Sequence, residues 1–213
     1  MKNIHRFITL IAAGVLLSTP ASVVALGAWT GKPLSAMQVE TNQYEPGDIQ
    51  THRIYLSTTG YRAESLGADG LISIIDYRQH LCWFVQKDGT YIEDPLDPAS
   101  GYCSPVEVPA AMEPRADLGG VLSTQPCDGY DLSRQLGTET VNGRNAQKWA
   151  CGHSPTRKEA THWFDPVLKL VVREKTDDGT TIEIRNIQFA PQPASLFRLP
   201  SGLTRVPRLK MPF

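Results

Sequence analysis

Most of the chain after Ile49 consists of short runs of apolar and β-branched residues separated by turn-forming residues. Such runs predict β-strands, and the turns between them are too short for the crossovers that parallel strands need. The sequence therefore predicts an antiparallel meander, with strands at 50–58, 61–66, 70–77, 81–86 and 90–93 and a second group at 134–141, 144–151, 158–164, 167–175 and 180–189. Ahead of them, residues 26–48 form a lead-in with one short helix expected near Leu34–Glu40.

Irregularities in the alternation predict how the sheet departs from a flat one. Ile182 and Ile184 have the opposite parity to Ile187, so a β-bulge is expected near Arg185-Asn186. The run LISIIDY at 71–77 is apolar on both faces, which indicates a strand covered on both sides. We expect a mainly β fold of the α+β type: a strongly curved antiparallel sheet forming an incomplete barrel, capped by a Pro-rich loop and at most short helices.

The segment 94–133 interrupts the strand pattern. It contains six prolines, several glycines and two of the four cysteines. A long insertion of this kind in a compact domain often serves as a lid or a binding loop. The alternative is a disordered linker between two domains.

Hairpin geometry selects a pairing for the four cysteines. If Asp88-Gly89 is a two-residue turn, Cys82 faces Pro95. If Asn142-Gly143 is another, Cys151 faces Arg134. The two other cysteines then lie just outside the bases of these hairpins. The expected disulfides, each pinning one end of the insertion, are Cys82–Cys103 and Cys127–Cys151.

The N-terminus has the three regions of a secretory signal peptide. Basic Lys2 and Arg6 precede the uncharged run Phe7 to Leu17, and small residues end at Ala25. The apolar run is too short to span a membrane comfortably. We expect export to the periplasm with cleavage near Ala25; the alternative is an N-terminal helix packed in the core. An oxidising compartment also explains the predicted disulfides.

The net charge argues against a nucleic-acid partner. It is −1 for the whole chain, and −3 once Lys2 and Arg6 leave with the signal peptide. The C-terminal end is locally basic, with Arg198, Arg205, Arg208 and Lys210. We interpret this end as a frayed tail, and weak contact with an anionic membrane surface is the alternative.

The sequence contains no motif that predicts catalysis. Nucleophile elbows, zinc-protease motifs and phosphate-binding loops are absent, and the cysteines form no Cys-x-x-Cys pair. His153 and His162 flank a predicted turn, but a hydrogen-bonded or surface role explains them better than a metal. Asp76 and Glu93 are interpreted as charges near turns. We therefore expect no enzyme activity, no cofactor and no resident metal.

The second half of the chain carries the motifs of a known family. They are GTETVNGRNAQKW (137–149), WFDPVLKLVVR (163–173), DDGTTIEIRNI (177–187) and PQPASLFRLPSG (191–202). These segments resemble exported bacterial proteins of the lipoprotein-carrier-like superfamily (LolA/LolB/LppX-like), whose uncharacterised members tend to end in a similar Ser-Leu-Phe-x-Leu-Pro-x-Gly segment. The resemblance implies one LolA-like domain over 26–213, with a curved sheet whose concave face is apolar. It implies a non-catalytic role: carrying acyl chains, binding other lipids or sensing periplasmic stress.

Together these features predict a periplasmic protein that binds an apolar ligand, a lipid or a lipoprotein acyl chain, in the concavity of the sheet. Core packing is the default role for the aromatic residues among the groove candidates, and lining an apolar cavity is the alternative. Those candidates are Ile72, Ile74, Trp83, Phe84, Trp149 and Trp163. The alternative function is an envelope scaffold or protein-interaction module whose groove is filled by its own side chains. A hydrolytic enzyme is the third hypothesis.

Overall fold

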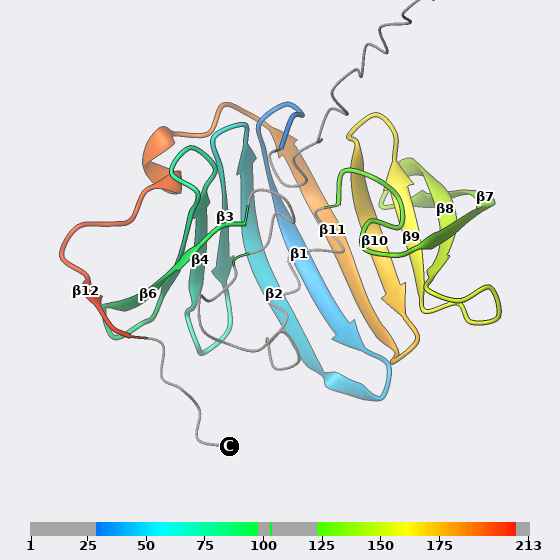
Figure 1. Cartoon of the computed structure of the whole chain (residues 1–213), viewed down its shortest axis with the longest axis horizontal. Coiled ribbons are helices and arrows are strands. Elements are labelled where there is room, and N and C mark those ends of the chain that lie inside the picture. Colours follow the sequence, from blue (N-terminus) through cyan, green and yellow to red (C-terminus); the bar gives the residue numbers. More distant parts are fainter. Residues whose placement is uncertain (1–28, 98–102, 104–122, 208–213) are drawn as a thin grey trace, which may run out of the picture.

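The computed structural model describes residues 29–97, 103 and 123–207. All described strands form one sheet in the order β12-β6-β5-β4-β3-β2-β1-β11-β10-β9-β8-β7, antiparallel except for the β12–β6 pair (Figure 1). The strands are β1 (Leu34–Asn42), β2 (Glu45–Ser57), β3 (Gly60–Ser65), β4 (Ile72–Asp76), β5 (Leu81–Val85), β6 (Thr90–Pro95), β7 (Leu132–Val141), β8 (Arg144–Gly152), β9 (Ala160–Asp165), β10 (Leu170–Thr176), β11 (Thr180–Phe189) and β12 (Thr204–Arg205).

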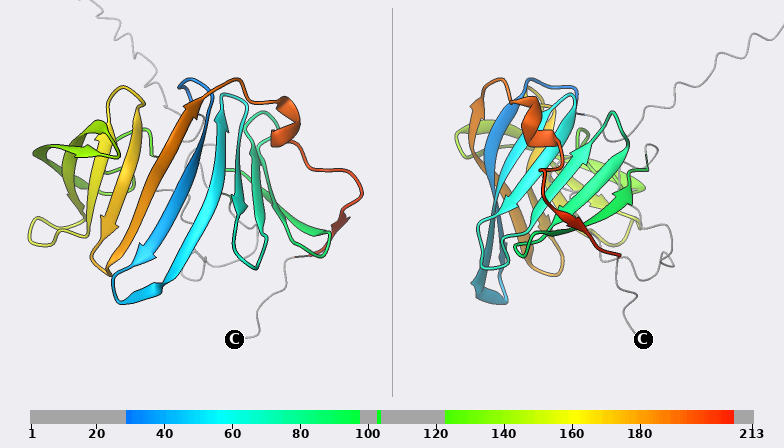
Figure 2. Two further views of the ribbon diagram at one scale, coloured as in Figure 1. Left: turned by 180° about the vertical axis from the view of Figure 1, so that it is seen from behind. Right: turned by 90° about the vertical axis from the view of Figure 1, so that its left-hand side faces the viewer.

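The described part of the chain is all-β. It contains no α-helix, and its one helical element is the 3₁₀ helix η2 (Ala194–Phe197). The sheet is open, with β12 and β7 as its two edges, and Figure 2 shows its twist from behind and from one end. The expected signal peptide at 1–25 and most of the insertion at 94–133 lie outside the described residues.

Strand β1 joins two meanders at the centre of the sheet. It pairs with β2 on one side and with β11 on the other, so the N-terminal and C-terminal groups of strands become one sheet. The helix expected near Leu34–Glu40 is wrong. Leu34, Ala36 and Gln38 alternate with less buried residues, which is the period of two of a strand rather than the 3.6 of a helix.

The turn predictions hold in one hairpin and fail by one residue in another. Asn142 and Gly143 have φ values of 47° and 77°, and Val141 pairs with Arg144, so this is the expected two-residue turn. The first hairpin instead closes with a three-residue loop at 87–89, which places Cys82 opposite Asp94 rather than Pro95.

The pairing register shifts at four places in the described sheet, and two of these shifts bear on the sequence predictions. In β11 the pairing with β1 shifts around Asn186, whose φ is 53°, which confirms the expected bulge. In β7 a shift between Gln135 and Gly137 places Cys151 opposite Ser133 instead of Arg134. The sequence of β7 has no regular alternation of apolar and polar residues, so nothing in it could predict this second bulge.

Both disulfides have the pairing that the hairpins predict. Cys82 is bonded to Cys103 and Cys127 to Cys151, with Cα–Cα distances of 5.9 and 5.2 Å. The one-residue register errors left the pairing unchanged because the partner cysteine in each case lies outside the hairpin. Two disulfides are typical of proteins that fold in an oxidising compartment such as the periplasm.

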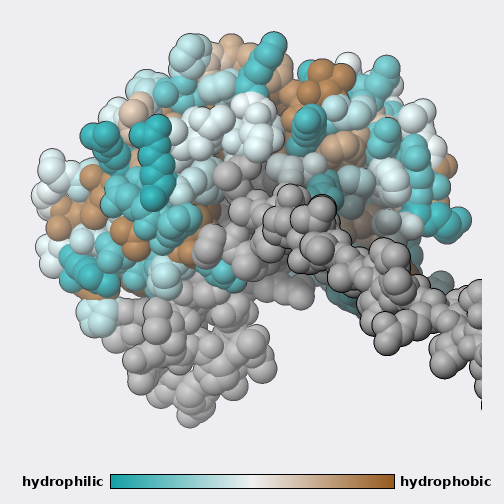
Figure 3. All heavy atoms as spheres, turned by 45° about the horizontal axis from the view of Figure 1, so that its top comes forward, coloured by the Kyte–Doolittle hydropathy of each residue, from teal (hydrophilic) through white to brown (hydrophobic). Residues whose placement is uncertain are grey.

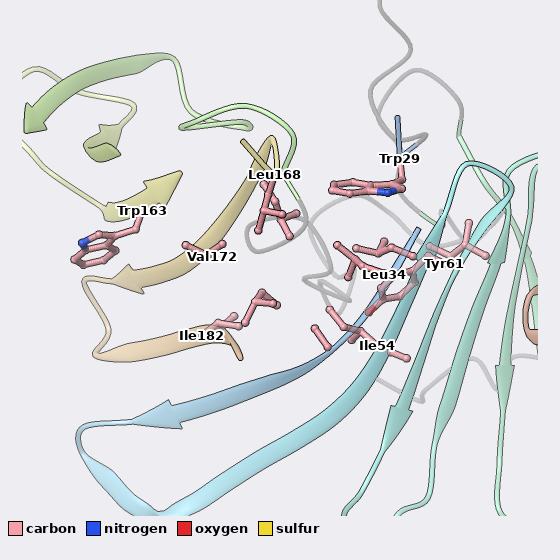
Figure 4. Close-up of a cluster of buried hydrophobic side chains, with 14 of the residues drawn as sticks. Trp29, Leu34, Ile54, Tyr61, Trp163, Leu168, Val172 and Ile182 are labelled. Carbon is pink, nitrogen blue, oxygen red and sulfur yellow. The ribbon is translucent and has the colours of Figure 1, made fainter. Parts of the chain in front are cut away.

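The apolar side chains form a main cluster and a second cluster on the opposite face of β4 and β5. In the main cluster, side chains from β1–β3 and from β10 and β11 point toward one another (Figure 4). Its labelled members are Trp29, Leu34, Ile54, Tyr61, Trp163, Leu168, Val172 and Ile182. Ile75 belongs to the main cluster and Ile74 to the second, which confirms that the LISIIDY strand is covered on both faces.

Candidate functional site

A C-terminal segment lies over the second cluster. We call residues 194–206, from η2 to just after β12, the strap; it passes outside β6 in Figures 1 and 2. Leu199 and Leu203 of the strap pack against the buried Ile74, Trp83 and Val85. The apolar patch on this face, completed by Ile72, Leu81 and Tyr91, is therefore partly covered by the chain itself.

Three backbone contacts hold the strap to the sheet. Thr204 N–H donates to the Gly89 carbonyl at 3.0 Å, and Val206 N–H donates to the Tyr91 carbonyl at 2.9 Å. At the other end, Arg62 Nη1 donates to the Leu196 carbonyl at 3.3 Å. Strand β12 has only two residues, so its ladder is a short one.

Phe197 anchors the beginning of the strap on β3. Its side chain is buried and lies so close to Gly60 that a Cβ built there would be 2.7 Å from the Phe197 Cβ. The position needs glycine for this close approach, because the backbone and the ring occupy the space of a side chain. The SLFRL sequence thus places the aromatic ring of Phe197 and the side chain of Leu199 on the sheet.

Glu93 links the strap to the floor of the patch. Its carboxylate accepts a hydrogen bond from Trp83 Nε1 at 3.0 Å and pairs with Arg205 of β12 at 3.2 Å. The indole of Trp83 is thereby fixed with its ring in the apolar cluster and its N–H satisfied. The sequence indicated only a charge near a turn for Glu93, and the structure gives this residue a bridging role.

A cavity of about 400 Å³ opens where η2 meets the sheet. Ligand pockets in proteins have volumes of about 300–1,000 Å³. Asp76 lies on the same face of β4 as Ile72 and Ile74, so the cavity is on the side of the apolar patch. The lining residues are Thr59, Asp76, Arg78, Gln79, Ala194, Phe197 and Arg198.

The cavity combines an apolar wall with two cationic groups. Phe197 and Ala194 supply the wall, and Arg78 and Arg198 supply guanidinium groups that form no ion pair within the described parts of the chain. The Asp76 carboxylate is already used: it accepts hydrogen bonds from the backbone N–H groups of Arg78 and Gln79 and from Gln79 Nε2. Such a lining suits a ligand with an anionic group and an apolar chain.

The structure separates the predicted groove residues into three places. Ile72, Ile74 and Trp83 share the second face under the strap. Phe84 packs against the main cluster on the opposite face. Trp149 packs beside the Cys127–Cys151 disulfide and Trp163 in the main cluster, so neither lines a common wall with Trp83.

Trp163 lies in a charged environment. Lys148 Nζ is 5.0 Å and the Arg173 guanidinium 5.3 Å from the centre of its ring, and its N–H donates to Glu139 at 3.1 Å. Hydrogen bonds from Lys148 and Trp163 lower the pKa of Glu139. On β11, burial alone raises the pKa of Glu183, but Arg185 and Arg173 lower it further than burial raises it.

One buried carboxylate organises the turn between β9 and β10. Asp165 is 1% exposed; it accepts hydrogen bonds from Val167 N–H at 2.8 Å and Leu168 N–H at 3.0 Å and pairs with Arg144. It therefore ties this turn to β8. This contact is structural rather than part of the cavity.

A second polar cluster surrounds the Cys127–Cys151 disulfide. His162 is fully buried, and its Nδ1 accepts a hydrogen bond from Cys127 N–H at 3.1 Å. Tyr130 lies between the two histidines that the sequence placed around a turn, with ring centres 5.3 Å from His153 and 5.6 Å from His162. The two imidazoles thus do not meet.

The surface around these sites is mixed. Figure 3 shows apolar residues in separate patches between polar ones on the face in view. No helix in the described part of the chain is long and apolar enough to cross a membrane. Within the basic C-terminal end, Arg205 is paired with Glu93, whereas Arg208 and Lys210 lie outside the described residues.

Comparison with known proteins finds similarity in structure only. No protein-family model and no curated protein sequence matches the chain. Among solved structures, PNGF-II is 9% identical with a TM-score of 0.47; the alignment covers 83% of this chain but 32% of PNGF-II, so the chain spans about a third of that protein. MucB is 16% identical with a TM-score of 0.42, over 83% of this chain and 60% of MucB.

A LolA superfamily protein from Nitrosomonas europaea is also similar. It is 6% identical with a TM-score of 0.35, and the alignment covers 84% of this chain and 94% of that protein. MucB has also been solved in complex with the periplasmic part of MucA, and that complex matches over 82% of this chain. Each of these alignments has a TM-score below 0.5 and a sequence identity of 16% or less.

Proposed function

We propose that this protein is a periplasmic, non-catalytic binder of an acyl-chain ligand on a curved, half-barrel sheet. The ligand's anionic group binds between Arg78 and Arg198, and its chain runs from the cavity beneath the strap along Ile74 and Trp83. The observation that carries this proposal is that the cavity lies on the same face of β4 as the apolar patch, and that its Arg78 and Arg198 form no ion pair with the described residues.

The energetics permit useful affinity. Burial of a twelve-carbon chain at about 0.8 kcal/mol per CH₂ contributes roughly 10 kcal/mol. Association costs at least about 4 kcal/mol in lost freedom, which leaves about 6 kcal/mol and a Kd of some tens of micromolar. The strap lowers this affinity further, because Leu199 and Leu203 occupy part of the apolar patch and must move aside.

Titration of the oxidised protein with a fluorescent fatty acid tests the proposal. We expect saturable binding with a Kd below about 200 µM. Arg78→Gln combined with Arg198→Gln is expected to weaken binding of the carboxylate probe about tenfold and to leave binding of the corresponding alcohol unchanged. Arg134→Gln, on the exposed β7, is the matched control. Absence of saturable binding by a folded, oxidised sample contradicts the proposal.

The alternative is a scaffold or interaction module whose groove is filled by its own chain. The observation in its favour is the strap itself, since its leucines already bury Ile74 and Trp83. The same titration separates the two functions. A scaffold gives no saturable probe binding, even when the strap is loosened by mutation.

A further inference from the structure

The polar cluster behind the Cys127–Cys151 disulfide has a composition that packing alone does not explain. A fully buried histidine, His162, lies beside two sulfur atoms, and Glu174, which is 6% exposed, faces the other side of its ring. Buried ionisable groups are costly unless they are paired and hydrogen-bonded. A function for these buried ionisable side chains would explain why they lie together at this position.

The hydrogen bond to Cys127 fixes the tautomer of His162. A backbone N–H can only donate, so Nδ1 carries no proton and the ring proton is on Nε2. Nε2 faces Glu174 Oε1 at 3.4 Å, but the alignment is too poor for a hydrogen bond, and Nε2 has no such partner in the described structure. The single lone pair of the imidazole, on Nδ1, is therefore engaged by Cys127 N–H, and a carboxylate faces Nε2.

The ligand atoms of Cys127, Cys151 and His162 all lie within 4.8 Å of one another. Zinc binds thiolate sulfur at about 2.3 Å and imidazole nitrogen at about 2.0–2.1 Å, so two ligand atoms on one ion are at most about 4.6 Å apart. To bind one ion together with the two sulfurs, His162 Nδ1 must give up its hydrogen bond to Cys127 N–H, so the backbone at Cys127 shifts once the disulfide is broken. In the oxidised chain the two sulfurs are bonded to each other and are not available.

We propose that reduction of the Cys127–Cys151 disulfide converts this cluster into a zinc site, with Cys127, Cys151 and His162 as ligands and Glu174 as the carboxylate that orients the histidine. A carboxylate behind a metal-bound histidine is the common arrangement in zinc proteins. A water molecule occupies the fourth position. This proposal is independent of the acyl-chain site, which lies on β3–β6 and the strap.

The chemistry balances with a dithiol reductant. The dithiol transfers two electrons to the Cys127–Cys151 bond, becomes a disulfide itself and leaves two protein thiols. Zinc then displaces the proton of each thiol and accepts one electron pair from each sulfur and one from Nδ1. His162 keeps its Nε2 proton, which faces Glu174.

Anaerobic titration of the reduced full chain with Co²⁺ tests the site, because cobalt reports thiolate ligation by its visible absorption. We use a phosphine as reductant so that no small-molecule thiol competes for metal. The expected result is one-to-one binding with thiolate–cobalt bands, displaced by zinc. The variant C82S/C103S is expected to keep these bands, and C127S/C151S to lose them.

Two further variants separate a specific site from adventitious thiol binding. His162→Gln should abolish the tetrahedral spectrum, and Glu174→Gln should lower zinc affinity about 10- to 100-fold. If the reduced chain unfolds without metal, zinc should restore its circular dichroism spectrum, since binding to the folded state drives folding. Absence of thiolate bands at saturating cobalt, failure of zinc to refold an unfolded reduced chain, or bands unchanged in His162→Gln overturns the proposal.

Discussion

Loosening the strap should increase the affinity for an acyl-chain ligand. The change is Leu199→Ala with Leu203→Ala, which removes the two side chains that pack on Ile74 and Trp83. Both leucines are half-buried, so each truncation loses about 1 kcal/mol, or about 2 kcal/mol together. The population with an open strap then rises about 30-fold. Apparent affinity is scaled by the population of the binding-competent state, so Kd should fall from the limit of about 200 µM toward the tens of micromolar expected for the open patch, a gain of up to about fivefold.

The assay is the fluorescent fatty-acid titration, with urea unfolding to verify that each variant is folded. Leu132→Ala with Leu136→Ala is the matched control, because it removes two leucines of similar exposure, 41% and 42%, from the distant strand β7. The control should bind like the natural protein. Unchanged or weaker binding by the strap variant refutes the reasoning, because the strap then does not compete with the ligand.

Three further predictions concern stability. Gly143→Ala should lower the free energy of unfolding by about 1–2 kcal/mol because φ is 77° there, whereas Gly47→Ala, in open space within β2, should be neutral or slightly stabilising in urea melts. Asp165→Ala should lower the free energy of unfolding by about 3–5 kcal/mol because it removes a buried, paired carboxylate. The control Asp177→Ala breaks an exposed ion pair, and an equal loss of stability in the two variants would contradict this prediction. The folded-state pKa of Glu183 is below 4.5, so its contribution to the free energy of unfolding is present above pH 4.5 and is lost as pH falls through the folded pKa. Glu183→Gln should therefore reduce the loss of stability in acid, measured by urea melts at a series of pH values. An unchanged dependence of the free energy of unfolding on pH contradicts this prediction.

The pattern of apolar residues predicted most strands of the sheet because local alternation reflects burial of one face. It predicted the bulge at Asn186 for the same reason, since a change of parity is visible in the sequence. It failed at Leu34–Glu40, where a mixed composition conceals a central strand paired on both sides. Pairing with distant strands, not local propensity, decides that segment.

The candidate site was predicted only in part. Ile72 and Ile74 were identified because LISIIDY is apolar on both faces, and Trp83 because aromatic residues recur on the predicted strands. The structure gathers these three residues on one face. The sequence could not predict that the strap covers these residues. The strap lies 110 residues or more further along the chain and is held by a parallel pairing of only two residues. The alternation of SLFRL was the available signal, and it was interpreted only as a family motif.

Photo-crosslinking tests the central claim most directly. A fatty acid with a photoreactive group near the end of its chain is bound to the oxidised protein, irradiated, and located by peptide mapping. The account predicts crosslinks to β4, β5 and the strap, around Ile74, Trp83 and Leu199, that an excess of unlabelled fatty acid prevents. Crosslinks confined to other strands, or crosslinks that competition does not reduce, would contradict it.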